Sequence, residues 1–475
     1  MFEKIFKLSQ NGTTVKTEIM AGLTTFMTMA YIIALNPNLL TNFGQEGTAL
    51  WNGVFLATCI ASSIGMFCMA FLANKPFCLA PGMGLNSFFA VVVGNIVGIT
   101  GMSYLASFQA ALIVILIEGL LFVILSIFNV REKIVESIPL GIRLGISPAI
   151  GLMLMNIGLG SNVGIYSENG GPFYVLRDFF GALTPSVAQN AMGSAYGQMI
   201  LTVVTMFIGL FIIVALAKRG INGAVLFGML GASIIYWAGS FIFLNTNPFA
   251  SLADASFLPP FQDMAQTTLF KLNFQGFLDI GWFTVITLTV TFCIIDMFDT
   301  IGTLVGTASR ANMVDDQGNM PKMKQALLSD AIATVTGACT GTSTVTTFVE
   351  SAAGVEAGGR TGLTALTCGL LFLACIFLAP IAAIIPPAAT SAALIYVGVL
   401  MLQGLKNINF GDMDQMVPVC LMLIAMPVSG SIGHGIGLGI IAYTMIKVFT
   451  GKFKDVSILT YIISALFLVK FFLVV

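Results

Sequence analysis

The chain has 475 residues, of which 57% are hydrophobic and only 9% are charged. In soluble globular domains roughly a quarter of all residues are charged, so this composition indicates an integral membrane protein. Twenty Lys and Arg residues face 21 Asp and Glu residues, which gives a formal net charge of -1. Because no basic excess is left to neutralise a phosphate backbone, we expect no nucleic-acid partner.

Cysteine spacing and short motifs narrow the functional classes further. The eight cysteines lie in apolar stretches without a CxxC pair, which predicts neither a disulfide framework nor a zinc site. The sequence contains no GxxxxGK[ST] loop, no dinucleotide fingerprint followed by an acidic residue and no HExxH motif. We therefore expect no cofactor, no metal and no ATP-driven transport.

The chain opens with a short amphipathic stretch, residues 1–16. Phe2, Ile5 and Phe6 would share one face of a helix, with charged residues beside them. This pattern is typical of a helix that lies on a membrane surface, and we expect it on the cytoplasmic side.

Fourteen apolar stretches follow, each near the length that a membrane-spanning helix needs. They lie at about residues 17–35, 50–73, 77–98, 103–128, 134–160, 198–217, 221–244, 281–307, 326–340, 342–359, 361–385, 387–404, 414–430 and 432–449. A further apolar segment at the C-terminus, residues 455–475, is compatible with a span and with a helix lying along the bundle.

The positions of Lys and Arg predict the orientation, because cytoplasmic loops retain an excess of them. With the N-terminus inside, the following residues also fall inside: Lys75, Arg131, Lys133, Lys218, Arg219, Arg310, Lys322, Lys324, Arg360, Lys406, Lys452 and Lys454. The loop 161–197, with Arg177, and the extracytoplasmic loop 245–280, with Lys271, then lie outside. We expect a multi-pass protein of the cell (cytoplasmic) membrane with a cytoplasmic N-terminus.

Two of the apolar stretches, residues 80–101 and 337–359, are rich in Gly, Ser and Thr. Broken or extended backbone at membrane depth needs protein or a water-filled cavity around it, because lipid cannot satisfy its N–H and C=O groups. The two stretches are the third and the tenth of the fourteen, seven segments apart. Because seven is an odd number of membrane crossings, the two halves of the chain would have opposite orientations in the membrane. Inverted repeats with broken helices that meet near the midplane are typical of secondary transporters.

The eighth stretch carries two carboxylates. Its polar residues follow spacings of three and four, which places them along one helical stripe: Asp296, Asp299, Thr300, Thr303 and Thr307. A carboxylate near the bilayer centre is costly unless it is paired, hydrated or protonated, so it marks a functional site by default. The alternative is an Asp that binds a neighbouring backbone N–H. We rank Asp299 above Asp296 as a group that touches substrate or proton.

The broken stretches add further polar and aromatic groups. Glu350 lies beside Ser351 in a break rich in Thr and Gly, and it would face the same cavity as Asp299 if their segments oppose one another. Asn86 offers a donor and an acceptor and Phe88 an aromatic face, which suits a flat heteroaromatic ligand. The alternative for Asn86 is that it satisfies the backbone of its own strand.

Polar residues in two other segments have more than one interpretation. Thr24, Thr28 and Tyr31 share a face of the first segment, where they would contribute to the site or hold helices together. Glu118 has only apolar neighbours in the fourth segment, and we interpret it as a structural partner between helices.

Four motifs occur along the chain in this order: TTFMTMAYIIALNP at 24–37, APGMGLNSFFA at 80–90, DMFDTIGTLVG at 296–306 and TTFVESAAGVEAGGRTGLTA at 346–365. Together they resemble the AzgA-like purine permeases of the nucleobase-cation symporter-2 group. The resemblance extends from the first span to about residue 450.

The resemblance implies fourteen transmembrane segments in two inverted seven-segment repeats, with short extended strands in segments 3 and 10. Residues 17–133 and 281–385 would form a core domain, and residues 134–244 and 386–449 a gate domain through which the chain forms a homodimer. Related uracil transporters place a Glu where Asp299 stands, a His where Thr303 stands and a Glu where Glu350 stands. The Thr at 303 departs from that pattern and fits a different base.

These observations predict an all-α polytopic membrane protein that imports purine nucleobases by proton symport with alternating access, and not an enzyme. Guanine and hypoxanthine are the expected substrates, with adenine and xanthine as further candidates. The expected substrate-binding residues are Asp299, Glu350, Asn86, Phe88, Thr303 and Ser351, and the expected proton-coupling residues are Glu350 and Asp299. Two other classes remain open, namely an intramembrane carboxylate enzyme resembling aspartyl proteases and a membrane receptor that does not transport.

Overall fold

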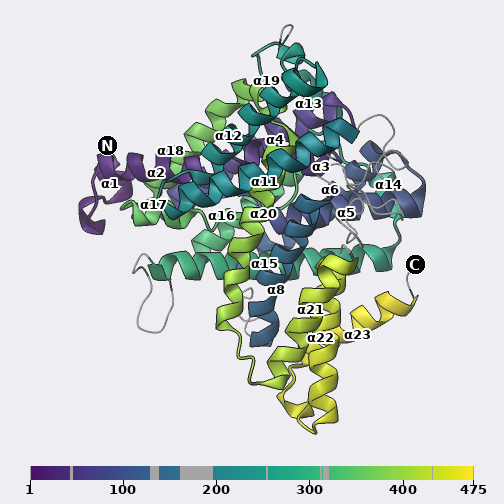
Figure 1. Ribbon diagram of the computed structural model, residues 1–475. Helices are drawn as coiled ribbons and strands as arrows, with labels where there is room; N and C mark the ends of the chain where they lie inside the picture. The colour runs from purple at the N-terminus through teal and green to yellow at the C-terminus, as the bar shows by residue number, and fades with distance from the viewer. Residues whose placement is uncertain are drawn as a thin grey trace. The chain divides into compact units, whose positions relative to one another are not determined.

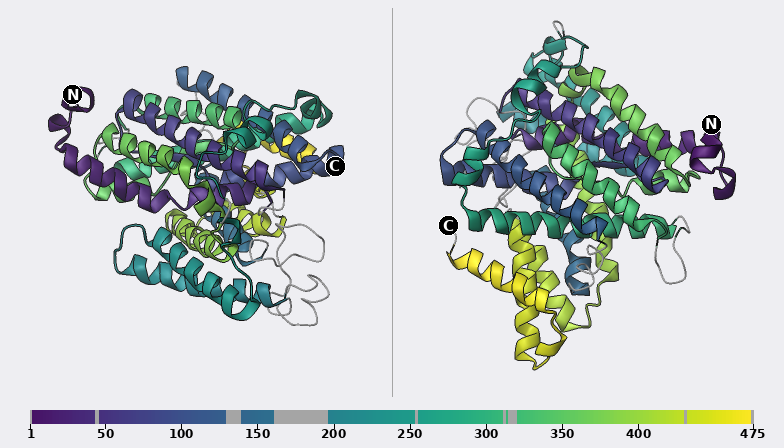
Figure 2. Two further views of the ribbon diagram at one scale, coloured as in Figure 1. Left: turned by 90° about the horizontal axis from the view of Figure 1, so that it is seen from above. Right: turned by 180° about the vertical axis from the view of Figure 1, so that it is seen from behind.

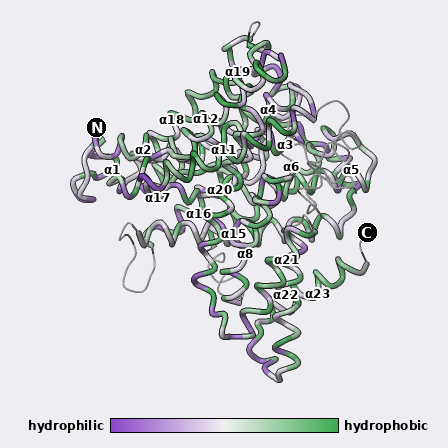
Figure 3. Tube along the Cα trace, in the orientation of Figure 1, coloured by the Kyte–Doolittle hydropathy of each residue, from purple (hydrophilic) through white to green (hydrophobic). Residues whose placement is uncertain are grey.

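A computed structural model of the chain describes residues 2–42, 46–128, 139–160, 196–252, 255–310, 313, 320–429 and 432–473. Helices dominate this part of the chain (Figure 1), and hydrophobic residues run along most of them (Figure 3). Arg131, Lys133 and the loop 161–195 with Arg177, all used to predict the orientation, lie outside the described residues.

Ten helical stretches in the described residues are long and apolar enough to cross a membrane. They are Val15–Leu40, Thr48–Ala73, Met83–Thr100, Tyr104–Ile127, Leu140–Leu159, Tyr196–Lys218, Ala224–Leu244, Gly362–Ala383, Pro387–Asn407 and Ile432–Phe449. Three shorter apolar helices accompany them, at Trp282–Met297, Met413–Ser429 and Ile458–Val469. The chain is therefore a multi-pass membrane protein, as its composition predicts.

The chain divides into two compact units, each assembled from two separate parts of the sequence. Unit 1 consists of Met1–Glu136 and Phe257–Ala379, and unit 2 of Ser137–Ser256 and Pro380–Val475.

Unit 1 brings helices from its two parts of the sequence into contact. The first part supplies α1 (Phe2–Phe6), α2 (Val15–Met29), α3 (Ile32–Leu40), α4 (Thr48–Cys68), α5 (Met83–Thr100) and α6 (Tyr104–Ile127). The second supplies α13 (Phe261–Thr267), α14 (Phe274–Asp279), α15 (Trp282–Arg310), α16 (Met323–Thr340), α17 (Ser351–Glu356) and α18 (Gly362–Ala374). Helix α16 packs against α4 and α6, and α18 packs against α2 and α4. Close approach depends on small residues: a Cβ added to Gly65 would lie 2.6 Å from the Ala333 Cβ.

Both Gly-rich stretches contain a short strand. Strand β1 (Leu79–Pro81) pairs antiparallel with β2 (Val345–Thr347), with Ala80 opposite Thr346. The pairing continues beyond the strands, since the Gly82 N–H donates to the Thr344 carbonyl at 3.1 Å. Each extended segment thus satisfies the other's backbone inside unit 1, which is the condition for non-helical backbone at membrane depth.

The first predicted segment consists of two helices, α2 and α3, with Tyr31 at their junction. The hydroxyls of Thr24 and Thr28 donate to carbonyl oxygens one turn back in α2, at 2.9 Å and 2.8 Å. Such hydrogen bonds bend helices. Thr24 and Thr28 therefore shape their own helix, and Tyr31 emerges where that helix is interrupted.

The predicted outer loop 245–280 contains the short helices α13 and α14. The Asn52 amide on α4 donates to Asp263 Oδ2 at 2.6 Å, and the Gln109 amide on α6 donates to the Thr267 carbonyl at 2.8 Å. Side-chain bonds from two membrane helices thus fix much of this stretch to unit 1.

Unit 2 contains α8 (Leu140–Leu159), α11 (Tyr196–Lys218), α12 (Ala224–Gly239), all but the first residue of α19 (Ala379–Ala383), α20 (Pro387–Met401), α21 (Met413–Ser429), α22 (Ile432–Phe449) and α23 (Ile458–Leu473). Helices α8 and α20 touch at Gly151 and Gly398, where a Cβ on either glycine would lie within 2.6 Å of the other's carbonyl oxygen. Helices α21, α22 and α23 lie in sequence order beside one another (Figures 1 and 2).

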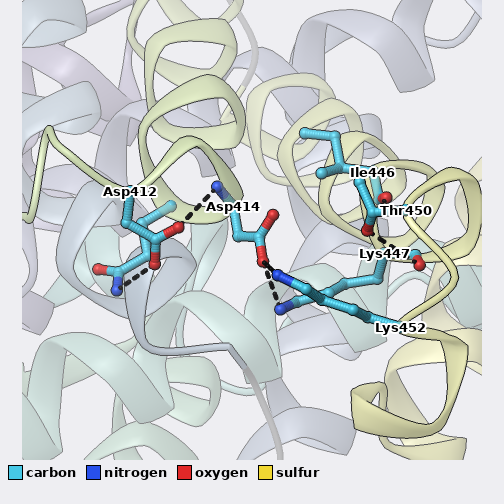
Figure 4. Close-up of polar contacts among 7 residues, drawn as sticks. Asp412, Asp414, Ile446, Lys447, Thr450 and Lys452 are labelled. Atoms are coloured by element: carbon cyan, nitrogen blue, oxygen red, sulfur yellow. Dashed lines mark hydrogen bonds and ion pairs between the residues drawn. The ribbon is translucent and has the colours of Figure 1, made fainter.

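The hairpin of α21 and α22 is fastened by charged side chains (Figure 4). Asp414 Oδ2 accepts from Lys447 Nζ at 2.5 Å and from Lys452 Nζ at 3.4 Å. The C-terminal apolar segment forms α23, which packs on α22 with the rings of His434 and Phe471 5.5 Å apart.

Candidate functional site

The strand pair fixes where two helices of unit 1 begin. Helix α5 starts directly after β1 and Gly82, and α17 starts after β2 and Glu350. The first N–H groups of a helix lack partners within the helix and favour nearby negative charge. A Cβ built on Gly82 would lie 3.5 Å from Asp299 Oδ2, so the Asp299 carboxylate lies close to the start of α5.

Asp299 and Glu350 form the centre of the candidate site. Both side chains are partly exposed on unit 1, and the two groups interact electrostatically. Tyr31 is buried and its hydroxyl donates to Glu350 Oε1 at 2.7 Å. Thr303 is also partly exposed, one turn after Asp299 on α15. The structure thus places two partly exposed carboxylates and a partly exposed hydroxyl on unit 1, and the buried Tyr31 phenol is bound to one of the carboxylates.

A second, buried polar cluster surrounds Thr300 on the same helix, α15. Thr300 Oγ1 lies 2.9 Å from Asp296 Oδ1, 3.1 Å from both carboxylate oxygens of Asp330 and 2.5 Å from Thr346 Oγ1. These four side chains are buried. Thr300 therefore joins α15 to α16 and β2 and also binds Asp296 within its own helix, whereas Asp299 on the same helix is partly exposed.

Two of the predicted site residues, Asn86 and Ser351, bind other parts of unit 1. The Asn86 amide donates to the Pro81 carbonyl at 3.1 Å, and its oxygen accepts from the Ser343 hydroxyl. Ser351 Oγ accepts from the Cys78 N–H at 2.9 Å. This geometry favours the interpretation of Asn86 as support for its own strand.

Phe88 is buried as well. Its ring lies 4.6 Å from the ring of Phe292 on α15, measured between centroids. This tilted pair packs α5 against α15, the helix that carries Asp299. Phe88 therefore supports the position of Asp299 and is buried rather than open to a ligand.

Sequence reasoning did not single out Asp330 or Glu18. Asp330 lies in the apolar stretch 326–340, and the membrane cost of a carboxylate would have identified it. Glu118, interpreted as a structural partner, is buried and accepts from the Thr344 hydroxyl at 2.7 Å, just before β2.

Glu18, in the first turn of α2, binds the turn that follows α17 and the start of α18. Its buried carboxylate accepts from the backbone N–H groups of Arg360, Thr361 and Thr364, at 2.8 to 3.2 Å, and from the Thr364 hydroxyl at 2.7 Å. A carboxylate at a helix start satisfies the unpartnered N–H groups there. The turn between α17 and α18 is thereby attached to α2.

Comparisons with known proteins complete the description of the site. A model described as the Permease family matches residues 16–189 and 182–432. The chain is 38% identical to the adenine permease AdeP of Escherichia coli (strain K12), over 99% of this chain and 96% of that protein. It is 36% identical to the guanine/hypoxanthine permease PbuO of Bacillus subtilis (strain 168), over 99% of this chain and 100% of that protein.

Solved structures show the same fold at low sequence identity. The transmembrane domain of the cyanobacterial bicarbonate transporter BicA is 16% identical, with a TM-score of 0.61, over 88% of this chain and 97% of that one. Murine SLC26A9, an anion transporter in the inward-facing state, has a TM-score of 0.63 at 12% identity, over 92% of this chain and 68% of that one. The sequence and structural similarities together indicate a transporter rather than an enzyme.

Proposed function

Because the chain belongs to the Permease family, we propose that it imports purine nucleobases across the cell membrane by proton symport with alternating access. The names of its relatives support a purine, since proteins 38% and 36% identical over almost the whole chain are adenine and guanine/hypoxanthine permeases. The transport alternative is therefore favoured over an intramembrane enzyme or a receptor. Guanine, hypoxanthine and adenine are the proposed substrates, with xanthine as a further candidate.

The observation that carries the proposal is the pair of partly exposed carboxylates, Asp299 and Glu350, next to the paired strands β1 and β2. A purine base is planar and carries N–H donors, and ionised carboxylates are acceptors only. Asp299 and Glu350 are proposed to accept from those donors, while the Thr303 hydroxyl completes recognition of the edge. Asn86, Phe88 and Ser351 are proposed to hold the surrounding backbone and helices in place.

The arrangement of spans is proposed to be fourteen in two inverted repeats. Its support is that a strand followed by a helix occurs twice, as β1 with α5 and β2 with α17, and that the two strands pair antiparallel. The division into units supports a core domain in unit 1 and a gate domain in unit 2. In alternating access, the proposed core and gate domains would move relative to one another during the transport cycle.

Proton coupling is assigned to Glu350 or Asp299, the two partly exposed carboxylates of the site. A carboxyl group that alternates between a protonated and an ionised form can carry one proton with each purine. A cytoplasmic N-terminus and a homodimer through gate helices belong to the same proposal, supported by the Lys and Arg pattern and by the family resemblance respectively.

The decisive experiment is uptake of labelled hypoxanthine and labelled adenine into proteoliposomes with an imposed pH gradient, acidic outside. We expect accumulation that a protonophore abolishes. Competition by unlabelled guanine, hypoxanthine, xanthine and adenine then orders the substrates. Purine accumulation that ignores the pH gradient would contradict proton symport, and no uptake of any purine would contradict the proposed substrate.

A further inference from the structure

The hydrogen bond between Tyr31 and Glu350 joins residues 319 positions apart in the sequence. Tyr31 is 1% exposed, whereas Glu350 is partly exposed at the start of α17. The phenol carries a single proton, and its oxygen lies 2.7 Å from Glu350 Oε1. That distance is typical of a hydroxyl that donates to an ionised carboxylate, which is a stronger bond than one between neutral groups.

The two Glu350 oxygens can have different partners. Oε1 accepts from Tyr31, and in the proposed site Oε2 would accept from a purine N–H. A phenol oxygen can accept as well as donate. When a proton from the external solution reaches Oε1, the carboxyl group can therefore donate to Tyr31 while Oε2 keeps its orientation toward the purine.

The ionisation of Glu350 depends on the charged and hydrogen-bonding groups around it. On α15, Asp299 interacts with Glu350 electrostatically and opposes a second negative charge. Helix α5 and strand β1 contain no titratable residue. The titratable residues of α2 are Lys16 and Glu18 in its first turn, and the Glu18 carboxylate is bound to the start of α18. The Tyr31 hydroxyl donates a side-chain hydrogen bond to the Glu350 carboxylate, and a bond donated to an ionised carboxylate stabilises it.

The backbones that carry the two residues are held at a fixed separation. Helix α17 lies against α2 at Gly354, where an added Cβ would lie 2.8 Å from the Ala21 carbonyl oxygen. The bonds from Glu18 attach the turn that follows α17 to the same helix, at Arg360 and Thr361. Tyr31 therefore meets Glu350 through rigid elements rather than through a mobile loop.

From these contacts we propose that Tyr31 is a positioning residue, which orients the Glu350 carboxyl group and sets the external pH range over which Glu350 accepts the symported proton. This role rests on the proposed function. The proton arrives from the external solution, resides on the Glu350 carboxyl group during transport and leaves to the cytoplasm.

The test is the pH profile of purine uptake by Tyr31→Phe, measured as initial rates in proteoliposomes at a series of external pH values and one internal pH. Loss of the donor disfavours the ionised carboxylate, so uptake should persist to higher external pH. A bond of typical net strength corresponds to an upward shift of the midpoint by about one pH unit. Tyr104→Phe is the matched control, because the Tyr104 hydroxyl donates to the Leu40 carbonyl at 3.0 Å, and its profile should stay at the wild-type midpoint.

A midpoint that stays in place or moves to lower pH in Tyr31→Phe would overturn the role of Tyr31. If this variant does not transport, purine binding to the purified protein at the same pH values replaces uptake, and the fall in affinity must again move to higher pH. Uptake by the wild-type protein distinguishes a failure of the proposed function from a failure of the proposed role of Tyr31. Wild type without purine uptake refutes the function itself, whereas normal wild-type uptake with an unshifted variant refutes only Tyr31.

Discussion

Gly354→Ala tests the contact that sets the separation of α2 and α17. A Cβ at this position would lie 2.1 Å from Thr25 Oγ1 and 2.8 Å from the Ala21 carbonyl oxygen. Carbon atoms in ordinary contact are about 3.5–4.0 Å apart, so α17 has to retreat by roughly 1 Å. Overpacking of this kind costs about 1–3 kcal/mol of folding free energy.

The larger effect of Gly354→Ala should be on transport. A retreat of roughly 1 Å stretches the bond of 2.7 Å between Tyr31 and Glu350 beyond hydrogen-bonding range. A misplacement of this size in a binding or catalytic constellation costs about 100-fold in rate. We therefore expect initial purine uptake to fall by about that factor while the protein still reaches the membrane.

Two measurements separate misplacement from misfolding, namely thermal unfolding of the purified protein and initial uptake rates in proteoliposomes. Gly98→Ala on α5 is the matched control, because the added Cβ meets no atom within 4 Å apart from the neighbouring backbone of its own helix. That variant should unfold at the wild-type temperature or slightly above it, since Ala favours a helix over Gly by about 1 kcal/mol. Wild-type uptake and stability in Gly354→Ala would refute the tight contact and the reasoning built on it.

The remaining predictions concern the individual site residues. Glu350→Gln should abolish accumulation while the protein stays in the membrane, because the amide keeps the shape and loses the titratable group; proton-driven uptake by this variant would remove Glu350 from the mechanism. Asp299→Asn should weaken purine binding, whereas Asp296→Asn should mainly lower the unfolding temperature, and the opposite pattern would show that the outward face of α15 is assigned wrongly. Asn86→Ala should weaken all purines by a similar factor in competition assays, since its amide supports β1 and Ser343; selective loss of oxo-purines or of adenine would instead indicate direct contact.

The broken segments could be predicted from the sequence, and their partners could not. Gly, Ser and Thr at membrane depth require a protein environment, which identifies residues 80–101 and 337–359 without a structure. The register of β1 on β2, and the bonds of Asn86 and Ser351 that fix it, join residues far apart in the chain. Composition and periodicity carry no information about such pairings.

Helical spacing in the sequence could not distinguish the buried from the partly exposed polar residues of α15. Asp296 and Thr300 are one row four residues apart, and Asp299 and Thr303 are a second row about 60° around the helix. A helical pattern treats both rows as one face. The structure separates them, because the first row is buried against Asp330 and Thr346 while the second is partly exposed.

The pairing of β1 with β2 also constrains the order of events during synthesis. The bond between Asn86 and Ser343 spans 257 residues, so at cellular rates of roughly 5–20 residues per second β1 leaves the ribosome some tens of seconds before its partner. Throughout that interval its backbone groups have no strand to bind, and lipid cannot replace one. The nascent third segment must therefore wait in contact with water, with the insertion machinery or with earlier helices. The strand pair of unit 1 can form only after residues 345–347 have been made, although the described helices α8, α11 and α12 of unit 2 have by then been synthesised.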